Sequence, residues 1–250
     1  MDDFTDRVAI VTGAGRGMGR ACAERLAAGG ARVVVNDVDE ARATRVAYEL
    51  AAGGADAIGV AADITSAADV ARLVDTARDR FGDVDVLVNN AGILRRTGIL
   101  DLDEDEWDLV LNVNLKGTYL CTRAVLPAMK KAGWGRVVNF SSTAGRSVST
   151  LGGPHYTTAK AAVLGFTRAV AKEMARHGIT VNAVCPGLVD TEMVGEFVTP
   201  EQVRDYAAGF PIRRLAQPEE VAELVAFLAS DRAAYITGAS LDINGGDLML

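Results

Sequence analysis

Gly13-Ala-Gly-Arg-Gly-Met-Gly19 follows a short apolar run, Arg7-Val-Ala-Ile-Val-Thr12, and precedes a segment of helical character over residues 20–28. A strand, a glycine-rich turn and a helix in this order form the first unit of dinucleotide-binding α/β folds. Such a turn lets the backbone approach a pyrophosphate, and the helix N-terminus offers unpaired N–H groups and a positive dipole end. An ordinary tight loop is the alternative interpretation of the same glycines.

The alternation of strand and helix continues beyond this turn. Further strands are predicted over residues 31–36, 56–62, 84–88, 136–140 and 180–184, and helical segments over residues 66–81, 103–131 and 156–176. Strands that alternate with helices form a parallel sheet, and right-handed crossovers place helices on both of its faces. We therefore predict an α/β fold, a doubly wound (Rossmann) parallel sheet of about seven strands, in a single domain over residues 1–250.

Residues 188–215 interrupt this alternation. They contain a helix start signal of their own, Thr199-Pro-Glu-Gln202, and we expect them to form a lid over the site. The apolar side chains of the segment either line a substrate pocket or form a small core within the lid, and both interpretations stay open: Met193, Val194, Phe197 and Phe210.

Composition excludes several classes of function. The 250 residues carry a formal net charge of -7, and an acidic chain is a poor ligand for the phosphate backbone of nucleic acid. Three separated cysteines in apolar surroundings and only two histidines predict reduced core thiols and no metal site. Because no run of 18 apolar residues is present, we expect no membrane span and a cytoplasmic protein.

Polar residues follow the predicted strands. Asp37 ends the second strand, Asp63 the third, Asn89-Asn90-Ala91-Gly92 the fourth and Ser141-Ser142 the fifth. The carboxyl ends of parallel strands meet at one edge of the sheet, and open α/β sheets bind ligands there. Asp37 lies where this fold places an acid against the adenosine ribose, so these positions predict a nucleotide site.

His155-Tyr-Thr-Thr-Ala-Lys160 opens a predicted helix on which Tyr156 and Lys160 share one face. A phenol has a pKa of about 10, and an ammonium about 5 Å away at an effective dielectric constant of about 20 contributes about 3 kcal/mol toward its ionisation. The pair therefore predicts a tyrosine with a lowered pKa that acts as a general base. A chance coincidence of two residues on one helix face is the alternative.

Taken together, these motifs resemble those of the short-chain dehydrogenase/reductase family over nearly the whole chain. The resemblance covers Thr12-Gly13 with Gly17 and Gly19, Asp63, Asn89 to Gly92, and Pro186-Gly187 with Thr191. It implies a catalytic tetrad of Asn114, Ser142, Tyr156 and Lys160. By spacing from Tyr156, Ser141 and Thr143 are the neighbouring candidates for the serine position, and we choose Ser142.

The resemblance also implies the remaining residues of a nicotinamide cofactor site: Gly13, Arg16, Gly17, Met18, Gly19, Asp37, Asp63, Ile64, Asn90, Ala91, Gly92, Tyr156, Lys160, Pro186, Gly187, Val189 and Thr191. Asp37 would accept hydrogen bonds from the ribose diol and repel a 2′-phosphate, which favours NAD over NADP. Arg16 is either a solvated arginine on an exposed turn or a phosphate-binding residue of the kind that other family members carry.

The implied reaction interconverts a secondary alcohol and a ketone. Tyr156 would exchange the proton of the substrate oxygen, Ser142 would orient that oxygen, Lys160 would hold the nicotinamide ribose, and Asn114 would hold a water that links Lys160 to solvent. An NADPH-dependent 3-oxoacyl-acyl-carrier-protein reductase is the alternative within this class. A non-catalytic NAD-binding sensor or scaffold is the alternative of another class.

Substrate identity is not predicted. Arg95 and Arg96 either meet an anionic substrate or are solvated surface residues, and His155 is a candidate pocket wall. The helix over residues 159–170 is apolar on nearly every face, and the chain ends in Leu248-Met-Leu250. These surfaces predict a homo-oligomer, and the family resemblance implies a homotetramer.

Overall fold

A computed structural model describes residues 4–250, which form one parallel sheet. Its strands are β1 (Val8–Val11), β2 (Arg32–Asp37), β3 (Ala57–Ala61), β4 (Val86–Asn89), β5 (Gly135–Phe140), β6 (Ile179–Pro186) and β7 (Ser240–Ile243). The seven strands lie in the order β3-β2-β1-β4-β5-β6-β7, and every pair is parallel. The order reverses between β1 and β4, so a crevice opens there at the carboxyl ends of the strands.

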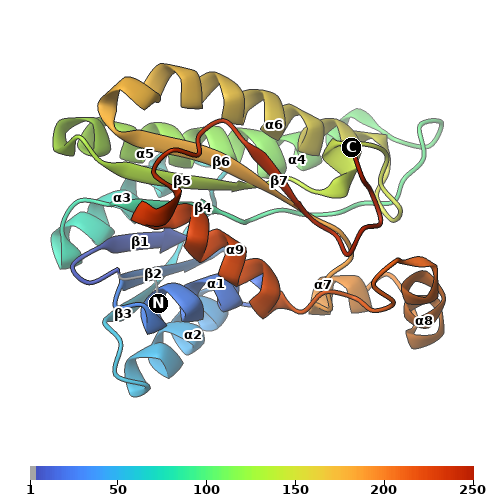
Figure 1. The fold of residues 1–250 in the computed structure, drawn as a ribbon, viewed down its shortest axis with the longest axis horizontal. Helices are drawn as coiled ribbons and strands as arrows, with labels where there is room; N and C mark the ends of the chain where they lie inside the picture. Colours follow the sequence, from blue (N-terminus) through green and yellow to red (C-terminus); the bar gives the residue numbers. More distant parts are fainter. Residues whose placement is uncertain (1–3) are drawn as a thin grey trace.

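Helices cover both faces of the sheet (Figure 1). They are α1 (Gly17–Ala28), α2 (Glu40–Ala52), α3 (Ala67–Phe81), α4 (Glu104–Leu111), α5 (Gly117–Ala132), α6 (Pro154–Met174), α7 (Glu192–Gly195), α8 (Pro200–Gly209) and α9 (Pro218–Ala229). One face packs against α1, α2 and α9, and the other against α3, α5 and α6. The predicted doubly wound α/β architecture is confirmed.

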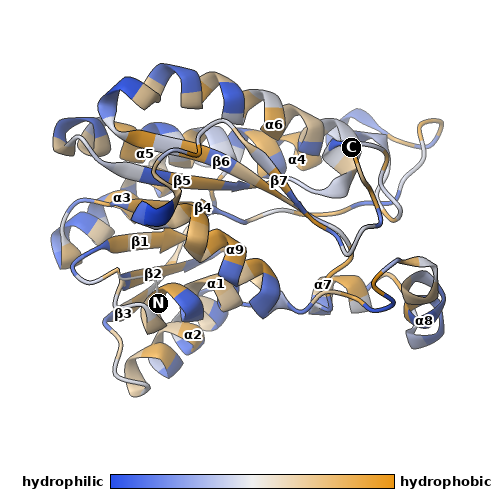
Figure 2. Ribbon diagram, in the orientation of Figure 1, coloured by the Kyte–Doolittle hydropathy of each residue, from blue (hydrophilic) through white to orange (hydrophobic). Residues whose placement is uncertain are grey.

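Alternate side chains of each strand supply the two cores. In β1, Ala9 and Val11 belong to the core beneath α1 and α9, whereas Val8 and Ile10 belong to the core beneath α3 and α5. All four residues are buried, as expected for a parallel strand covered on both faces. The continuous apolar colour of the central strands in Figure 2 reflects this double burial, which fixes the strand ends in place.

Two parts of the fold differ from the sequence-based expectation. β7 was not predicted as a separate strand, because its short run Ser240–Ile243 is only half-buried at the edge of the sheet. The predicted helix over residues 103–131 begins with α4 and ends with α5, but a π-helical turn, Asn112–Lys116, lies between them. Such turns insert one extra residue per turn and re-aim the side chains that they carry.

Residues 188–215, hereafter the lid segment, contain α7 and α8 and project from the carboxyl edge of the sheet (Figure 1). A capping box of Thr199 and Gln202 starts α8, as predicted. Cys22, Cys121 and Cys185 are buried free thiols. Within residues 4–250, no helix is long and apolar enough to cross a membrane, and no cluster of His, Cys, Asp or Glu is able to hold a metal ion.

Candidate active site

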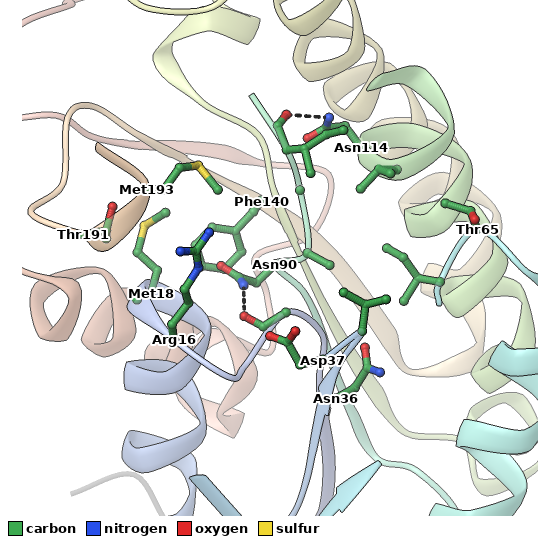
Figure 3. A pocket seen from close by; sticks show the side chains of 18 of the residues that line it. Arg16, Met18, Asn36, Asp37, Thr65, Asn90, Asn114, Phe140, Thr191 and Met193 are labelled. Carbon is green, nitrogen blue, oxygen red and sulfur yellow. Dashed lines mark hydrogen bonds between the residues drawn. The ribbon is translucent and has the colours of Figure 1, made fainter. Parts of the chain in front are cut away.

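A cavity of about 390 Å³ lies at the carboxyl ends of β1, β2, β4 and β5. Most of the residues predicted for the site line it: Gly13, Arg16, Gly17, Met18, Asp37, Asp63, Ile64, Asn90, Ala91, Gly92, Asn114, Tyr156, Lys160 and Thr191. Figure 3 shows Arg16, Met18, Thr191 and Met193 along one side, with Asp37 and Asn36 nearby and Asn114 farther along the wall. Residues from distant parts of the chain thus meet at the predicted edge.

Five predicted residues are not among those that line the cavity: Gly19, Ser142, Pro186, Gly187 and Val189. Gly19 packs within the turn, where an added Cβ would collide with the carbonyl oxygen of Gly13. Pro186 ends β6, Gly187 donates its N–H to the Ile243 carbonyl, and Val189 is 2% exposed. Pro186, Gly187 and Val189 shape the loop that carries Thr191, but they do not themselves line the cavity.

The glycine turn is locked to the end of β4. The Thr12 hydroxyl accepts hydrogen bonds from the N–H groups of Asn90 and Ala91, each at 3.1 Å. The Asn90 side chain donates to the carbonyl oxygens of Thr12 and Gly13, both at 3.0 Å. Gly13 has φ +60°, and an added Cβ would lie 2.8 Å from Ala91 Cα. Only glycine fits this contact, which holds the turn open toward the cavity.

Asp37 is held at the tip of β2 by the backbone. Its Oδ2 accepts the Gly15 N–H and its Oδ1 accepts the Asp39 N–H, each at 3.0 Å. The residue is 7% exposed and lines the cavity. A carboxylate with both oxygens anchored in this way keeps a fixed negative charge beside the glycine turn.

Asn114 lies in the π-helical turn and is buried. Its amide nitrogen donates to the carbonyl oxygens of Ile93 and Val110, both at 2.9 Å. Its Oδ1 is buried and has no hydrogen-bond partner among residues 4–250. A Cβ on Gly92 would lie 2.6 Å from Asn114 Oδ1 and 3.3 Å from Lys160 Nζ. The free oxygen therefore faces the small space that Gly92 leaves beside the lysine, and a hydrogen-bond donor such as water fits there.

Lys160 enters the site from α6. Its Nζ donates to the Phe140 carbonyl oxygen at 3.0 Å, at the end of β5. The residue is 5% exposed, and burial lowers the pKa of its ammonium to about 8. The Ser141 hydroxyl donates to the Lys160 carbonyl oxygen at 2.8 Å, so Ser141 is engaged in holding α6. Ser142 Oγ accepts the Ala144 N–H at 3.1 Å and shares a side-chain hydrogen bond with Tyr156.

Tyr156 lies on the same face of α6, and Lys160 Nζ is 5.7 Å from the centre of its ring. Burial raises the pKa of the Tyr156 phenol to about 12, and a side-chain hydrogen bond with Ser142 acts in the opposite direction. The expectation that Lys160 lowers this pKa was wrong for the protein's own groups. Desolvation is the largest cause of the shift, and the lysine ammonium is itself directed to the Phe140 carbonyl. At neutral pH the tyrosine is therefore a neutral phenol that is able to donate a proton.

His155, the neighbour of Tyr156, is completely buried between α4 and α6. Its Nε2 lies 3.2 Å from Glu106 Oε1, and its Nδ1 lies 2.9 Å from where a Cβ on Gly153 would stand. Glu106 is on α4, and this helix directly precedes the π-helical turn that carries Asn114. The expected pocket wall is thus a packed link that joins the helix of the tyrosine to the helix before the asparagine. His155 does not line the cavity.

The lid segment closes one side of the site. Leu94, Leu151 and Val198 form a small buried cluster, and Tyr156 packs against it together with lid residues: Leu188, Met193, Val194, Phe197, Val203 and Tyr206. Arg96 donates to the Phe197 carbonyl oxygen at 2.9 Å. Of the four apolar lid residues named from sequence, Met193, Val194 and Phe197 belong to this cluster, and Phe210 does not.

Sequence reasoning missed several residues that line the cavity: Asn36, Val38, Arg42, Ala62, Thr65, Ile93, Leu109, Val113, Phe140 and Glu192. Val38, Thr65 and Ile93 each lie within two residues of a predicted site residue, so a strand-end rule that includes flanking positions would have found them. Val113 precedes the predicted Asn114 directly, whereas Leu109 of α4 lies next to no predicted site residue and carries no such signal.

The cavity fits a nicotinamide dinucleotide. The glycine turn precedes the N-terminus of α1, and an anchored carboxylate stands at the next strand end, as a pyrophosphate and an adenosine ribose require. Gly13, Gly17 and Met18 would hold the pyrophosphate, Asp37 the adenosine ribose, Asp63 and Ile64 the adenine, and Tyr156 and Lys160 the nicotinamide ribose. A reduced nicotinamide supplies a hydride when it is bound there.

Known proteins of similar sequence and structure cover the whole chain. A family model described as Enoyl-(Acyl carrier protein) reductase matches residues 13–247. A 3-oxoacyl-(acyl-carrier-protein) reductase of Synechocystis sp. is 45% identical over 251 residues, or 100% of both chains. Short-chain reductase protein NovJ of Streptomyces niveus is 45% identical over 96% of this chain and 94% of its own.

The solved structures agree with the sequence matches. The crystal structure of a 3-oxoacyl-(acyl-carrier protein) reductase from Brucella melitensis superimposes with a TM-score of 0.94 at 35% identity. The match covers 99% of this chain and 93% of that one. The similarity therefore extends over the sheet, the helices and the lid segment alike.

Proposed function

The chain belongs to the short-chain dehydrogenase/reductase family, whose members are nicotinamide-dependent oxidoreductases acting on CH–OH groups, and on this premise we propose that it reduces the 3-oxo group of an acyl thioester to a hydroxyl. The Synechocystis relative, a 3-oxoacyl-(acyl-carrier-protein) reductase, supports this substrate class, because the match covers both chains in full. The reductase alternative is thus better supported than the oxidation of a free secondary alcohol.

The full-length match to the Synechocystis reductase is the observation that carries this proposal. The site is compatible with it, because desolvation raises the pKa of the Tyr156 phenol to about 12 and the phenol therefore holds the proton that ketone reduction consumes.

Each residue of the tetrad has a proposed role in that reduction. Tyr156 donates its proton to the substrate carbonyl oxygen, and the Ser142 hydroxyl stabilises the negative charge that develops on the same oxygen. Lys160, fixed by the Phe140 carbonyl, positions the cofactor ribose. Asn114 holds a water with its free Oδ1, through which Lys160 and then Tyr156 regain a proton from solvent.

The lid segment is proposed to cover the substrate. The apolar side chains that it packs around Tyr156 suit the alkyl part of an acyl chain and exclude water from the proton donor. Arg96 is engaged by the Phe197 carbonyl and is proposed to fasten the lid segment, and Arg95 stays a candidate for a negatively charged part of the substrate.

For the cofactor, the site favours NAD, which separates this proposal from the NADPH-dependent alternative. Asp37 accepts two backbone hydrogen bonds at the position of the adenosine ribose, and its charge would repel a 2′-phosphate. An NAD-dependent oxidoreductase of a secondary alcohol is the second candidate function, because this same carboxylate suits a cofactor that serves oxidation.

Assembly as a cytoplasmic homotetramer is part of the proposal. The outward side of α6 carries small or half-buried residues, including Ala161, Gly165 and Ala169, beside an edge-to-face contact of Tyr119 with Phe166. Met249 and Leu250 are 76% and 81% exposed. Apolar surfaces of this kind are costly in water and are usually covered by a second copy. Light scattering should report a multiple of the 26.2 kDa chain, and an active monomer would contradict the assembly.

One assay separates the candidate functions. Purified protein is given acetoacetyl thioesters of coenzyme A and of acyl-carrier protein with NADH or NADPH, and a panel of secondary alcohols with NAD⁺ or NADP⁺. Thioester reduction with a higher kcat/KM than any alcohol oxidation supports the proposal. Oxidation of an alcohol alone would favour the second candidate. Cofactor binding without turnover of any substrate would indicate the non-catalytic sensor.

A further inference from the structure

The arginine of the glycine turn is already neutralised by an acid from the lid segment. Arg16 Nη1 lies 2.5 Å from Glu196 Oε1, and the two side chains are 30% and 53% exposed. The partners are 180 residues apart in the chain, and Glu196 follows directly after α7. Sequence reasoning left Arg16 either solvated or free to bind phosphate, and the structure places it in neither state.

Arg16 lies in the glycine turn, next to the point where the turn contacts Asp37. Its neighbour Gly15 donates its N–H to Asp37, and Arg16, Asp37 and Arg42 all line the same cavity. Figure 3 shows the Arg16 side chain extending into the cavity from the turn, on the side where Met18 lies and with its guanidinium directed away from Asp37. Because Arg16 and Asp37 line the same cavity, a phosphate bound between them would meet the Arg16 charge.

The other cations near this part of the cavity also have acidic partners. Arg42 Nε lies 3.3 Å from Asp39 Oδ2, and Arg45 Nε lies 4.0 Å from Glu49 Oε1. Both pairs are local contacts within or next to α2. Only the partner of Arg16 comes from the lid segment, so among these three arginines it is the one whose charge depends on where the lid segment lies.

The lid segment touches the glycine turn at more than this pair. A Cβ on Gly17 would lie 3.4 Å from Thr191 Cγ2 and 3.5 Å from Glu192 Oε2. Glu192 also acts electrostatically on Arg20, which follows the turn. Two lid carboxylates therefore face the start of α1, and a phosphate that approached Arg16 would meet Glu196 as a competitor.

We propose that Glu196 is a specificity-determining residue: by pairing with Arg16 it withholds the cation that a 2′-phosphate needs, and so couples the choice between NAD and NADP to the position of the lid segment. This inference rests on the proposed nicotinamide cofactor and is independent of the proposed substrate. Asp37 would exclude the 2′-phosphate by direct repulsion, whereas Glu196 would exclude it by occupying the Arg16 charge that could compensate.

Equilibrium binding tests the proposal without turnover. In Glu196→Gln, the Kd for NADP⁺ and for adenosine 2′,5′-bisphosphate should fall about fivefold, the scale of one exposed charge pair. The Kd for NAD⁺ should change less than twofold. Calorimetric titration measures all three. Glu196→Ala is the second variant, and it should give the same selective change.

Two controls decide whether the effect passes through Arg16. Glu201→Gln removes an exposed acid from the first turn of α8 and should leave all three Kd values unchanged. In Arg16→Gln, adding Glu196→Gln should no longer tighten NADP⁺ binding. Equal tightening for NAD⁺ and NADP⁺, or a gain that persists without Arg16, would overturn the proposal. Either failure leaves the thioester assay, and with it the proposed function, untouched.

Coupling to the lid segment has a reciprocal consequence. If the closed lid segment disfavours NADP⁺, then bound NADP⁺ must disfavour the closed lid segment by the same factor. Hydrogen exchange over residues 192–209 in the wild type should be faster with saturating NADP⁺ than with saturating NAD⁺. The difference should vanish in Glu196→Gln. Equal exchange with both cofactors in the wild type would overturn the coupling.

Discussion

The catalytic end of the sheet and the lid segment are held by different means. At the catalytic end, the buried Asn89 side chain donates to Thr122 and Asn139, and Asn139 donates to Thr167 of α6. These bonds join β4, α5, β5 and α6 beneath the tetrad. In the lid segment no residue of α7 or α8 is buried. Its ties to the rest include the exposed Arg16–Glu196 pair, the Arg96 bond and the small cluster of Leu94, Leu151 and Val198.

This contrast separates chemistry from selection. Proton transfer needs groups fixed within a fraction of an ångström, and buried hydrogen bonds between packed elements provide that. Cofactor and substrate must enter and leave, so the region that contacts both is held by contacts that cost little to break. Substitutions at the catalytic end should change kcat, and those in the lid segment should change KM and specificity.

Tyr156→Phe should give the largest effect, because it removes only the oxygen that carries the proton. We expect kcat to fall on the order of 10³-fold, the usual scale of a general acid. The Kd for the cofactor, measured by titration, should change less than about threefold, since the ring and Lys160 stay in place. Residual activity within tenfold of the wild type would assign proton donation to another group.

Lys160 should set the pH dependence of reduction. The pKa of Lys160 lies at about 8 because of burial, so the ammonium is present at lower pH and is lost as pH rises through that value. We expect kcat/KM for reduction to be level near pH 7 and to fall above pH 8. Lys160→Met should lower the plateau on the order of 10²-fold and abolish that alkaline limb.

The same pKa values predict the contribution of the pair to stability. The folded pKa of Lys160 is below its ordinary value of 10.5, so between pH 8 and 10.5 the unfolded chain binds more protons, and this group makes the free energy of unfolding rise with pH. Tyr156 has a folded pKa above its ordinary value of 10, so its contribution falls with pH between 10 and 12. If the rise in the free energy of unfolding between pH 8 and 10.5 persists in Lys160→Met, another group causes that rise.

Substitution of Asp37 tests whether the adenosine end of the cavity behaves like the catalytic end of the sheet, hereafter the fixed region, or like the lid segment, which governs selection. Asp37→Asn keeps an oxygen for the Gly15 N–H and removes the charge, so the ratio of kcat/KM for NADH over NADPH should fall about tenfold. Asp37→Ala also removes that bond and should cost stability, seen as a lower Tm. A wild-type enzyme that prefers NADPH would refute the role given to Asp37.

The sequence predicted the fixed region better than the lid segment, for a physical reason. Tyr156, Lys160 and the glycine turn act through neighbours on one helix or one turn, so their spacing alone carries the signal. The partners Arg16 and Glu196 are distant in the chain, and only the fold brings them together. The contact of His155 with Glu106 and the π-helical turn at Asn114 depend in the same way on how helices pack.

The predicted lowering of the Tyr156 pKa was the wrong prediction with the clearest cause. Sequence gives the distance between a phenol and an ammonium on a helix, but it does not give their burial. Lys160 is buried and Tyr156 is partly buried, and Lys160 is turned toward the Phe140 carbonyl, so desolvation outweighs their attraction. The sign of a shift therefore required the packed structure.

Removal of one N-terminal helix cap in each region should give the smallest effects. These effects also distinguish the two regions most clearly. Thr199→Ala removes the N-cap of α8, where Thr199 Oγ1 accepts the Gln202 N–H at 3.3 Å. Such a cap contributes about 1 kcal/mol to its helix. Because no residue of α8 is buried, the loss should be confined to local opening. We expect faster hydrogen exchange over residues 200–209 and a KM about twofold to threefold higher, with Tm nearly unchanged.

Ser66→Ala is the matched variant in the fixed region. Ser66 Oγ accepts the Asp69 N–H, also at 3.3 Å, and caps α3, whose Val70, Leu73 and Phe81 are buried in the core. Here α3 cannot open without exposing that core, so the same loss of about 1 kcal/mol should appear as a Tm lower by about 2–4 °C, with KM unchanged. If Thr199→Ala lowers Tm as much as Ser66→Ala does, the lid segment unfolds together with the sheet, and selection does not reside in a separately movable region.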